Sequence, residues 1–146
     1  MEYTNKIENI TAAMLESAHG GGFFAGWPNP PSSNVHLEIL RRSYTAWVAI
    51  DTTQASAQVV GFVNAVSDGI LTAYIPLLEV RPQYQGRGIG KELMRRILDE
   101  LSNLYMIDIV HDKELAAFYA KFGAFQSHAS IFRNYAAQSG AVTQDK

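Results

Sequence analysis

Three glycines spaced two residues apart offer the clearest chemistry in this chain of 146 residues. Gly86, Gly88 and Gly90 lie between an apolar run that ends at Val80 and a run of helical periodicity that begins near residue 88. Backbone N–H groups in such a turn can point at a bound anion, and the start of the helix adds a partial positive charge. The spacing therefore predicts a phosphate-binding turn between a strand and a helix. The same residues also fit a glycine-rich helix start that binds nothing.

Two common phosphate-binding loops do not fit this turn. A Walker A loop needs G-x-x-x-x-G-K-[ST], but Gln85 stands five residues before Gly90, and Glu92 follows Lys91. A dinucleotide-binding fingerprint needs G-x-G-x-x-G, and its third glycine would fall on Lys91. The pattern that remains is Q-x-x-G-x-G, formed by Gln85, Gly88 and Gly90.

The elements that position this turn follow from hydrophobic periodicity. The pattern predicts helices over residues 8–19, 33–42, 88–102 and 112–121, strands over 44–50, 58–66, 70–80 and 104–110, and one or two closing strands within 124–135. We expect the strand at 70–80 to be buried on both faces. This order predicts an α/β (α+β) sheet with helices on its faces and an antiparallel meander in its middle. Residues 1–138 are expected to form a single domain, and residues 139–146 a frayed polar tail.

Composition excludes several classes of site. With no cysteine in the chain there are no disulfides, thiolate nucleophiles or cysteine-ligated metals, and His19 and His36 have no partners at ligand spacing, so we expect no metal. The net charge of −2 and the absence of a basic stripe argue against nucleic-acid binding. The apolar run at 73–80 is interrupted by Pro76 and Glu79 and is too short to cross a bilayer. We expect a cytoplasmic protein without a membrane segment.

Residues 78–90 resemble the coenzyme-binding motif of the GNAT superfamily of N-acetyltransferases. The family pattern is an apolar residue followed by P-x-[YF]-[QR]-G-x-G-[IL]-G, and this chain reads L-E-V-R-P-Q-Y-Q-G-R-G-I-G. Residues 118–125, F-Y-A-K-F-G-A-F, are similar to a second family signature, an aromatic pair on a helix that ends in glycine and an aromatic residue. The resemblance covers roughly residues 44–126. It implies a central mixed, mostly antiparallel sheet flanked by helices, and an N-acetyltransferase that uses acetyl-CoA without a metal.

The resemblance also implies where acetyl-CoA binds. The glycine turn would hold the pyrophosphate on its backbone amides, and the pantetheine arm would run beside the preceding strand. The backbone N–H of Val80 would stabilise negative charge on the thioester oxygen. The residues assigned to the coenzyme in this way are Leu78, Val80, Gln85, Gly86, Arg87, Gly88, Ile89, Gly90 and Lys91.

Tyr119 occupies the position of the family's usual tyrosine, which implies that it protonates the departing thiolate. A tyrosine titrates near pH 10, so its hydroxyl is protonated and can donate at pH 7. The alternative is a core aromatic residue on an amphipathic helix. His111 and Asp112 follow the strand at 104–110, and we interpret them as a surface residue and a helix cap.

Glu79 is the only carboxylate on the strand at 70–80, which makes it the candidate general base or the group that binds the amine. Several family members carry a base earlier on this strand, but the matching positions here hold Tyr74 and Pro76. A carboxylate in apolar surroundings has a raised pKa, which suits a base. Two alternatives stay open: Glu79 faces the other way and pairs with Arg81 or Arg133, or water deprotonates the amine without a dedicated base.

The acceptor pocket is expected to be lined by aromatic residues. Phe23, Phe24 and Trp27 lie in a glycine- and proline-rich stretch, and Tyr74 lies on the coenzyme strand. They can form a substrate wall, or the first three can simply cap the core. Together with Glu79 they favour a small primary amine with an alkyl or aryl body. Peptide N-termini, lysine side chains, aminoglycosides and polyamines stay open as acceptors.

Two further hypotheses concern the role and the assembly of the chain. The alternative to an enzyme is a non-catalytic acyl-CoA-binding sensor or interaction module. The exposed edge of a C-terminal strand would offer a surface for a homodimer.

Overall fold

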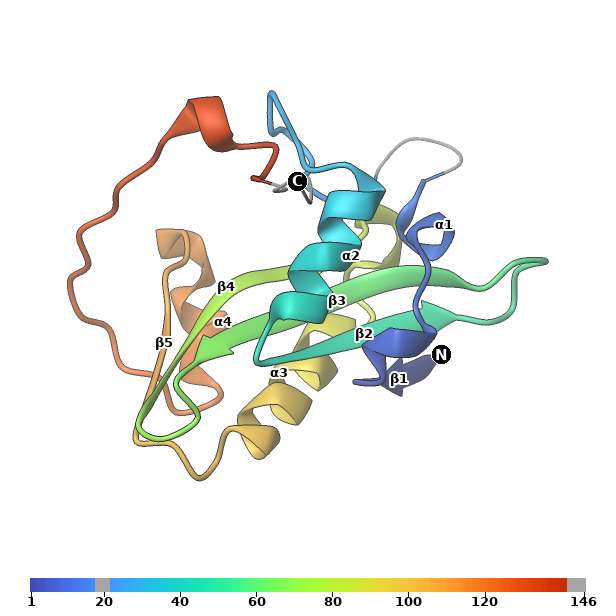
Figure 1. Cartoon of the computed structure of the whole chain (residues 1–146). Helices are drawn as coiled ribbons and strands as arrows, with labels where there is room; N and C mark the ends of the chain where they lie inside the picture. Colours follow the sequence, from blue (N-terminus) through green and yellow to red (C-terminus); the bar gives the residue numbers. More distant parts are fainter. Residues whose placement is uncertain (18–21, 142–146) are drawn as a thin grey trace.

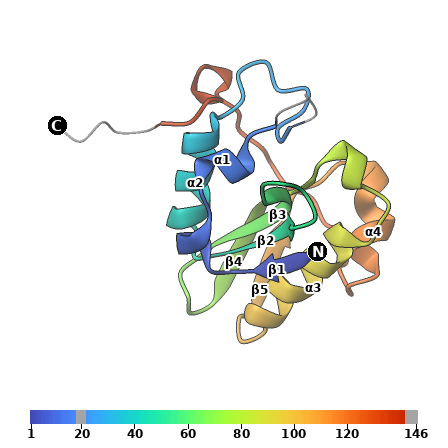
Figure 2. The same cartoon turned by 90° about the vertical axis from the view of Figure 1, so that its right-hand side faces the viewer.

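The computed structural model describes residues 1–17 and 22–141, which form a five-stranded sheet with helices on both faces (Figures 1 and 2). The strands are β1 (Glu2–Thr4), β2 (Thr45–Asp51), β3 (Gln58–Ser67), β4 (Thr72–Val80) and β5 (Met106–Ile109), and they lie side by side in that order. Neighbouring strands are antiparallel, except for the parallel pair β4–β5. This arrangement confirms the expected mixed, mostly antiparallel sheet of the α/β class.

The helices divide between the two faces of the sheet. They are α1 (Ala12–Leu15) and α2 (Ser33–Arg42) on one face, and α3 (Ile89–Glu100) and α4 (Ala116–Ala120) on the other. Four short 3-10 turns complete the elements in the described part of the chain: η1 (Ile7–Asn9), η2 (Pro82–Tyr84), η3 (Lys113–Leu115) and η4 (Tyr135–Ala137). Within residues 1–17 and 22–141, no helix has the length and apolar character that crossing a bilayer requires.

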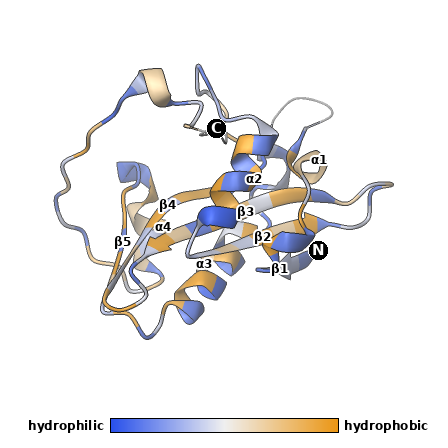
Figure 3. Cartoon of the chain, in the orientation of Figure 1, coloured by the Kyte–Doolittle hydropathy of each residue, from blue (hydrophilic) through white to orange (hydrophobic). Residues whose placement is uncertain are grey.

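The sheet separates two hydrophobic cores. On the α1/α2 face, Leu40 and Phe62 are almost fully buried. On the α3 face, the helix approaches β3 closely at Gly61, where a Cβ atom would lie 3.1 Å from the side chains of both Ile89 and Leu93. Hydrophobic and hydrophilic residues alternate around α3 in Figure 3, as expected for a helix with one buried side. Glycine at position 61 therefore sets how closely α3 and the turn before it sit on the sheet.

β4 contains a bulge that divides it into two halves. Ile75 and Pro76 of β4 stand opposite the single residue Ala65 of β3. Pairing with β5 ends at Ile75, and Pro76 has no N–H group to continue a ladder. In the described chain, residues 77–80 therefore pair with β3 on one side only, and the N–H groups on their other edge have no backbone partner.

Most predicted elements are confirmed, with ends shifted by at most two residues. The helices at 33–42 and 88–102 correspond to α2 and α3, and Ser32 caps α2 by accepting the N–H of Val35 at 3.2 Å. The helix predicted at 112–121 is split into η3 and α4. β1 was not predicted, because three residues are too few to show a period.

Three expectations are wrong. The helix at 8–19 is interrupted, since Thr11 caps a new helix by accepting the N–H of Met14, and residues 18–21 lie outside the described part. β4 is not buried on both faces, because the side of Tyr74 is open and its side chain is 37% exposed. Residues 124–134 form no strand in the described chain, so the closing strands and the homodimer edge predicted there are absent. Residues 142–146 of the predicted tail lie outside the described part.

Candidate active site

The free edge of β4 presents backbone donors in an alternating pattern. The N–H of Arg81 donates to the carbonyl of Val60 at 2.8 Å, so the backbone of Arg81 points toward β3. Because successive residues of a paired strand alternate in direction, the N–H groups of Val80 and Leu78 point the opposite way. The Nε2 of Gln85 reaches the Val80 carbonyl from that side at 2.9 Å. Two N–H groups are thus offered to any extended ligand that lies along this edge.

The glycine turn follows directly after this edge. Gly86 and Gly88 have φ angles of 74° and 81°, and a Cβ atom on either would meet no atom within 4 Å. Gly88 is also the N-cap of α3, where it supplies no side-chain cap. The N–H groups at the start of α3 consequently have no side-chain partner among the described residues, and open space lies in front of the turn. This geometry fits an anionic group such as a pyrophosphate.

A tyrosine–aspartate pair holds the turn in place. The hydroxyl of Tyr84 donates to Oδ2 of Asp51 at the end of β2, over 2.6 Å. This bond holds the pKa of Asp51 well below its ordinary value and raises the pKa of Tyr84. Arg87 stacks over the Tyr84 ring at 5.1 Å and donates to the carbonyl of Gln83. The pair was missed from sequence, because nothing in a single sequence links two residues 33 positions apart.

Glu79 lies at a cavity of about 200 Å³ at the end of β4. The cavity is lined by Gly22, Ala25, Leu78, Glu79, Val80, Pro82 and Gln85. Oε2 of Glu79 accepts the N–H of Phe24 at 2.8 Å, and burial raises the pKa of this carboxyl above its ordinary value. The cavity is therefore lined both by a carboxylate of raised pKa and by the backbone edge of Leu78 and Val80.

Arg81 does not pair with Glu79, and neither does Arg133, so that alternative is not found in the described chain. The guanidinium of Arg81 is buried and donates to the carbonyls of Leu15 and Glu16 at 3.1 and 2.9 Å. It thereby fixes the end of α1 beside the cavity.

In the loop after residue 22, the residue that donates to Glu79 has an unfavourable backbone conformation. Phe24 has a φ of 61°, a left-handed conformation that is unfavourable for a bulky side chain. Its bond to Glu79 and its buried ring hold it there: the ring is 4% exposed and lies 5.0 Å from both His36 and Trp27. Burial lowers the pKa of His36 to about 4, so this residue is neutral in the cluster.

The predicted acceptor residues do not all come together. The rings of Phe23 and Phe24 pack on Phe62 and belong to the core of the α1/α2 face. Trp27 and Tyr74 are each 37% exposed, but Tyr74 lies before the β4 bulge and makes no ring contact with the other three in the described structure. A wall made of these aromatic side chains therefore stays a prediction.

Tyr119 is buried in the core of the α3 face, against which Leu78 and Val80 also pack. Its ring lies 4.6 Å from that of His111, and its hydroxyl makes no hydrogen bond to any described residue. Burial raises the pKa of the hydroxyl, so Tyr119 stays protonated at neutral pH. Asp112 precedes η3 without a side-chain cap bond, so its predicted capping role is not observed.

A second cavity, of about 280 Å³, lies between α2 and the bulged part of the sheet and was not predicted. Asn64 lines it, is 3% exposed, and leaves Oδ1 without a partner while Nδ2 donates to Ser43. The signal in the sequence was an asparagine inside an otherwise apolar strand. Elsewhere, the described residues contain no group of three or more His, Cys, Asp or Glu that could hold a metal ion.

Comparison with known proteins yields one consistent family. The sequence profile described as the acetyltransferase (GNAT) family matches residues 12–124. The uncharacterized N-acetyltransferase ycf52 of Porphyra purpurea is 28% identical over 123 residues, which span 83% of this chain and 68% of that protein. A candidate acetyltransferase from Deinococcus radiodurans R1, known from a crystal structure, is 42% identical with a TM-score of 0.88, over 97% of this chain and 94% of that one. Glucosamine-6-phosphate N-acetyltransferase from Arabidopsis thaliana shares the fold, with a TM-score of 0.62 at 12% identity over 91% and 97% of the chains.

Proposed function

Because this chain belongs to the acetyltransferase (GNAT) family and is an acetyl-CoA-dependent acetyltransferase, we propose that it acetylates the primary amine of a small molecule. One observation carries the proposal: the cavity at the end of β4 joins Glu79 to the free backbone edge of Leu78 and Val80. At about 200 Å³, it suits a compact amine better than a folded polypeptide surface.

The free edge and the turn supply the coenzyme site in this proposal. The N–H groups of Leu78 and Val80 bond the extended pantetheine arm as a neighbouring strand would. The backbone amides of residues 85–91, at the start of α3, hold the pyrophosphate. Open space at the Cβ positions of Gly86 and Gly88 supports this assignment, since phosphate oxygens need a close approach to the backbone. Arg87 and Lys91 add positive charge at the rim.

Three groups of the chain share the chemistry of transfer. Glu79 takes the proton from the amine, because a carboxyl with a raised pKa is a competent base near neutral pH. The N–H of Val80 donates to the thioester oxygen as negative charge develops there. Tyr119, protonated because burial raises its pKa, donates to the sulfur as the C–S bond breaks.

The acceptor is held by charge and by apolar contact. Glu79 attracts an ammonium group, and the exposed ring of Trp27 offers an apolar or cation–π surface near the same loop. Such a site favours an alkyl- or arylamine over a polyamine or an aminoglycoside, which carry several cations and need more than one carboxylate.

Release of free CoA from acetyl-CoA tests this proposal on a panel of arylalkylamines, alkylamines, polyamines, aminoglycosides and peptides. We expect turnover with a monoamine, and we expect Glu79→Gln to lower kcat/KM by about tenfold or more. The matched control is Glu8→Gln, since Glu8 is an exposed carboxylate on η1, far along the chain from the cavity. Binding of acetyl-CoA without CoA release for any monoamine, or equal rates in both variants, would contradict the proposed substrate class and the role of Glu79.

A further inference from the structure

The segment that carries the glycine turn is fastened to a strand that is not its neighbour. Residues 81–88 run from the end of β4 to the start of α3, and η2 lies within them. At their start, the N–H of Arg81 bonds to β3 at the carbonyl of Val60. Three residues later, the hydroxyl of Tyr84 bonds to Asp51 of β2. Because β3 lies between β2 and β4, the segment reaches past β3 to the strand beyond it.

Asp51 is itself fixed by the turn that follows β2. Its Oδ1 accepts the N–H of Thr53 at 2.9 Å and the hydroxyl of Thr53 at 2.7 Å, while its Oδ2 accepts the hydroxyl of Tyr84 at 2.6 Å. These donors, the hydroxyl of Tyr84 first among them, hold the pKa of the carboxyl below its ordinary value, so Asp51 is ionised near neutral pH. Asp51 is only 7% exposed. A buried carboxylate held by three donors is a fixed point for the segment that contains Tyr84.

Two other side-chain bonds of this segment are local. Nε2 of Gln85 donates to the carbonyl of Val80 at 2.9 Å, and the guanidinium of Arg87 donates to the carbonyl of Gln83 at 3.0 Å. Both bonds shape the segment from within. The bond from Tyr84 differs from them because it reaches another strand. It therefore sets where the glycine turn lies relative to the sheet.

The two glycines that follow make such an anchor useful for ligand binding. Gly86 and Gly88 both have positive φ angles in the turn. Glycine adopts these angles readily, but it adopts many others as well, so a turn built on two glycines loses much conformational entropy when it takes one shape. A bond that already fixes Tyr84 reduces the entropy that remains to be lost when a ligand binds. The turn is thereby preorganised for an anion.

Asp51 acts through position and not through its charge. An ionised carboxylate repels a phosphate, so its charge alone would weaken the binding of an anion at the turn. Its bond to Tyr84, in contrast, holds the ring of that residue in one place. The guanidinium of Arg87 stacks over this ring at 5.1 Å, so the same bond also supports a positive charge next to the glycines.

We propose that Asp51 is a positioning residue for the coenzyme: through Tyr84 it holds the glycine turn in the shape that binds a pyrophosphate. This inference rests on the proposed function, which places the pyrophosphate on residues 85–91. A thioester of pantetheine alone has no pyrophosphate, so its binding gains nothing from the position of the turn. The bond between Tyr84 and Asp51 therefore makes the chain select acetyl-CoA over S-acetylpantetheine.

The dissociation constants of acetyl-CoA and of S-acetylpantetheine, measured by isothermal titration calorimetry, test this role. Tyr84→Phe removes the hydroxyl but keeps the ring, which packs against the core of the α3 face. We expect the Kd for acetyl-CoA to rise about tenfold, because a hydrogen bond to a charged group is lost, and the Kd for S-acetylpantetheine to change by less than about twofold. Both constants come from one sample, so an unfolded fraction cancels in their ratio.

Thr53→Val is the matched control, because it removes a hydroxyl that bonds to the other oxygen of the same carboxylate. Thr53 is exposed, and we expect both constants to stay within about twofold of their wild-type values. If Thr53→Val raised the Kd for acetyl-CoA as much as Tyr84→Phe does, the loss would follow from a weakened turn between β2 and β3, and the proposal would be overturned.

A further variant separates this inference from the coenzyme site on which it rests. Gly88→Ala places a methyl group in the proposed phosphate space and leaves Tyr84 and Asp51 unchanged. If Gly88→Ala raises the Kd for acetyl-CoA and Tyr84→Phe does not, the pyrophosphate site stands and the role of Asp51 is overturned. If neither variant changes the ratio of the two constants, the pyrophosphate site and the role of Asp51 are both overturned. No amine is present in these titrations, so the result is independent of the proposed acceptor.

Discussion

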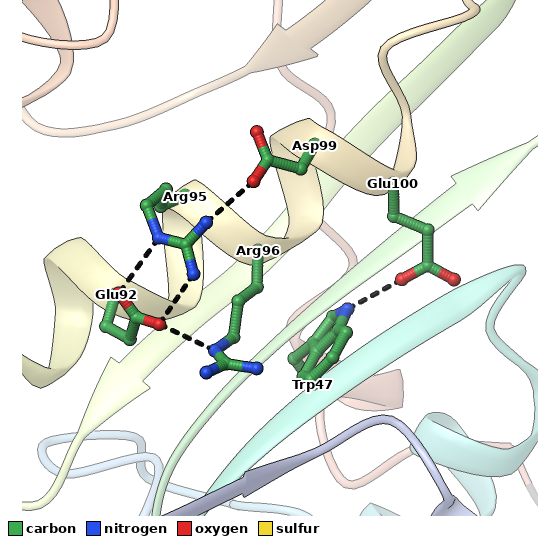
Figure 4. A network of polar contacts seen from close by, with 6 residues as sticks. All are labelled: Trp47, Glu92, Arg95, Arg96, Asp99 and Glu100. Atoms are coloured by element: carbon green, nitrogen blue, oxygen red, sulfur yellow. Dashed lines mark hydrogen bonds and ion pairs between the residues drawn. The ribbon is translucent and has the colours of Figure 1, made fainter.

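Polar side chains on the outer face of α3 are paired with one another, whereas the backbone donors at the turn before this helix have no side-chain partner among the described residues. On the outer face, Glu92 bonds to Arg95 at 2.8 Å and to Arg96 at 2.7 Å, and Arg95 also reaches Asp99 at 2.7 Å (Figure 4). Arg96 further stacks over Trp47, whose indole N–H donates to Glu100 at 2.6 Å. These contacts tie β2 to α3, and they pair Glu92, Arg95, Arg96, Asp99 and Glu100 within the chain.

The start of the same helix, and Tyr119 on the neighbouring α4, have no such partners among the described residues. Gly88 caps α3 without a side chain, and the hydroxyl of Tyr119 makes no hydrogen bond to them. An unpaired polar group at a partly buried site lowers stability, so it persists where a ligand supplies the missing bond. We therefore expect the polar side chains of the proposed site, Glu79 and Tyr119, to govern catalysis with little effect on folding, and the charged side chains on the outer face of α3 to do the reverse.

Among the variants of the proposed site, Tyr119→Phe is expected to have the largest effect on the rate. Removal of the hydroxyl leaves the ring packed in the core but takes away the proposed acid, so kcat should fall about 100-fold. The midpoint of thermal unfolding and the KM for acetyl-CoA should hardly change. Steady-state kinetics and a melting curve check this, with Tyr105→Phe as the control because that side chain is 84% exposed. An unchanged kcat would place Tyr119 among the structural residues.

The next effect concerns the pH dependence of the rate. Because burial raises the pKa of Glu79, the base form is lost as pH falls through a value above the ordinary pKa of a glutamate. We expect log kcat/KM to fall with a slope of about one per pH unit on this acid limb, a tenfold loss for each unit. The profile of Glu79→Gln should lack this limb. If the limb survives in the variant, another group is the base.

A matched pair of glycines separates ligand binding from backbone strain. Gly88→Ala and Gly123→Ala both place a side chain at a positive φ, of 81° and 90°, with no atom within 4 Å of the new Cβ. Each should lower the free energy of unfolding by about 1 kcal/mol. Only Gly88→Ala should also raise the Kd for acetyl-CoA, by about tenfold or 1.4 kcal/mol, because the methyl group enters the proposed phosphate space. Isothermal titration calorimetry measures the binding, and equal Kd values for both variants would place the phosphates elsewhere.

The smallest effect belongs to the outer face of α3. Glu92 has its pKa lowered to about 2 by its bonds to Arg95 and Arg96, so its stabilising effect is complete above the ordinary glutamate pKa and disappears as pH falls toward 2. Glu92→Gln should therefore lower the free energy of unfolding at pH 7 by only about 0.5–1 kcal/mol, since these pairs are partly exposed. The difference should shrink at pH 3, and kcat should not change. Urea unfolding at the two pH values checks this, and a changed kcat would break the contrast between the two regions.

The parts of the site that depend on local sequence were predictable. The run from Leu78 to Gly90 contains its own strand, turn and helix start, so the turn could be placed without knowing the rest of the fold. The bond from Phe24 to Glu79 and the bond from Tyr84 to Asp51 could not, because each joins segments that only folding brings together.

The failures of prediction also have local causes. Helical spacing from Ile7 to Leu15 continues across Thr11, but Thr11 is the N-cap of a separate helix, so the apolar residues before and after it do not belong to one helix. The strand predicted over 124–135 reflects β-forming residues, yet a strand also needs a neighbour, and residues 125–133 make no backbone hydrogen bond to another backbone group in the described chain.

The bulge at Pro76 makes the two halves of β4 differ in phase. Before it, odd-numbered residues such as Ile75 face the α3 core; after it, even-numbered residues such as Leu78 do so, and Glu79 turns to the opposite face. Deletion of one residue at the bulge would exchange these two positions, so that the carboxylate would enter the hydrophobic core and an apolar side chain would meet the acceptor. The proposed site therefore depends on the length of the strand as well as on its residue types, because a shift of one position would take the carboxylate of Glu79 out of the cavity.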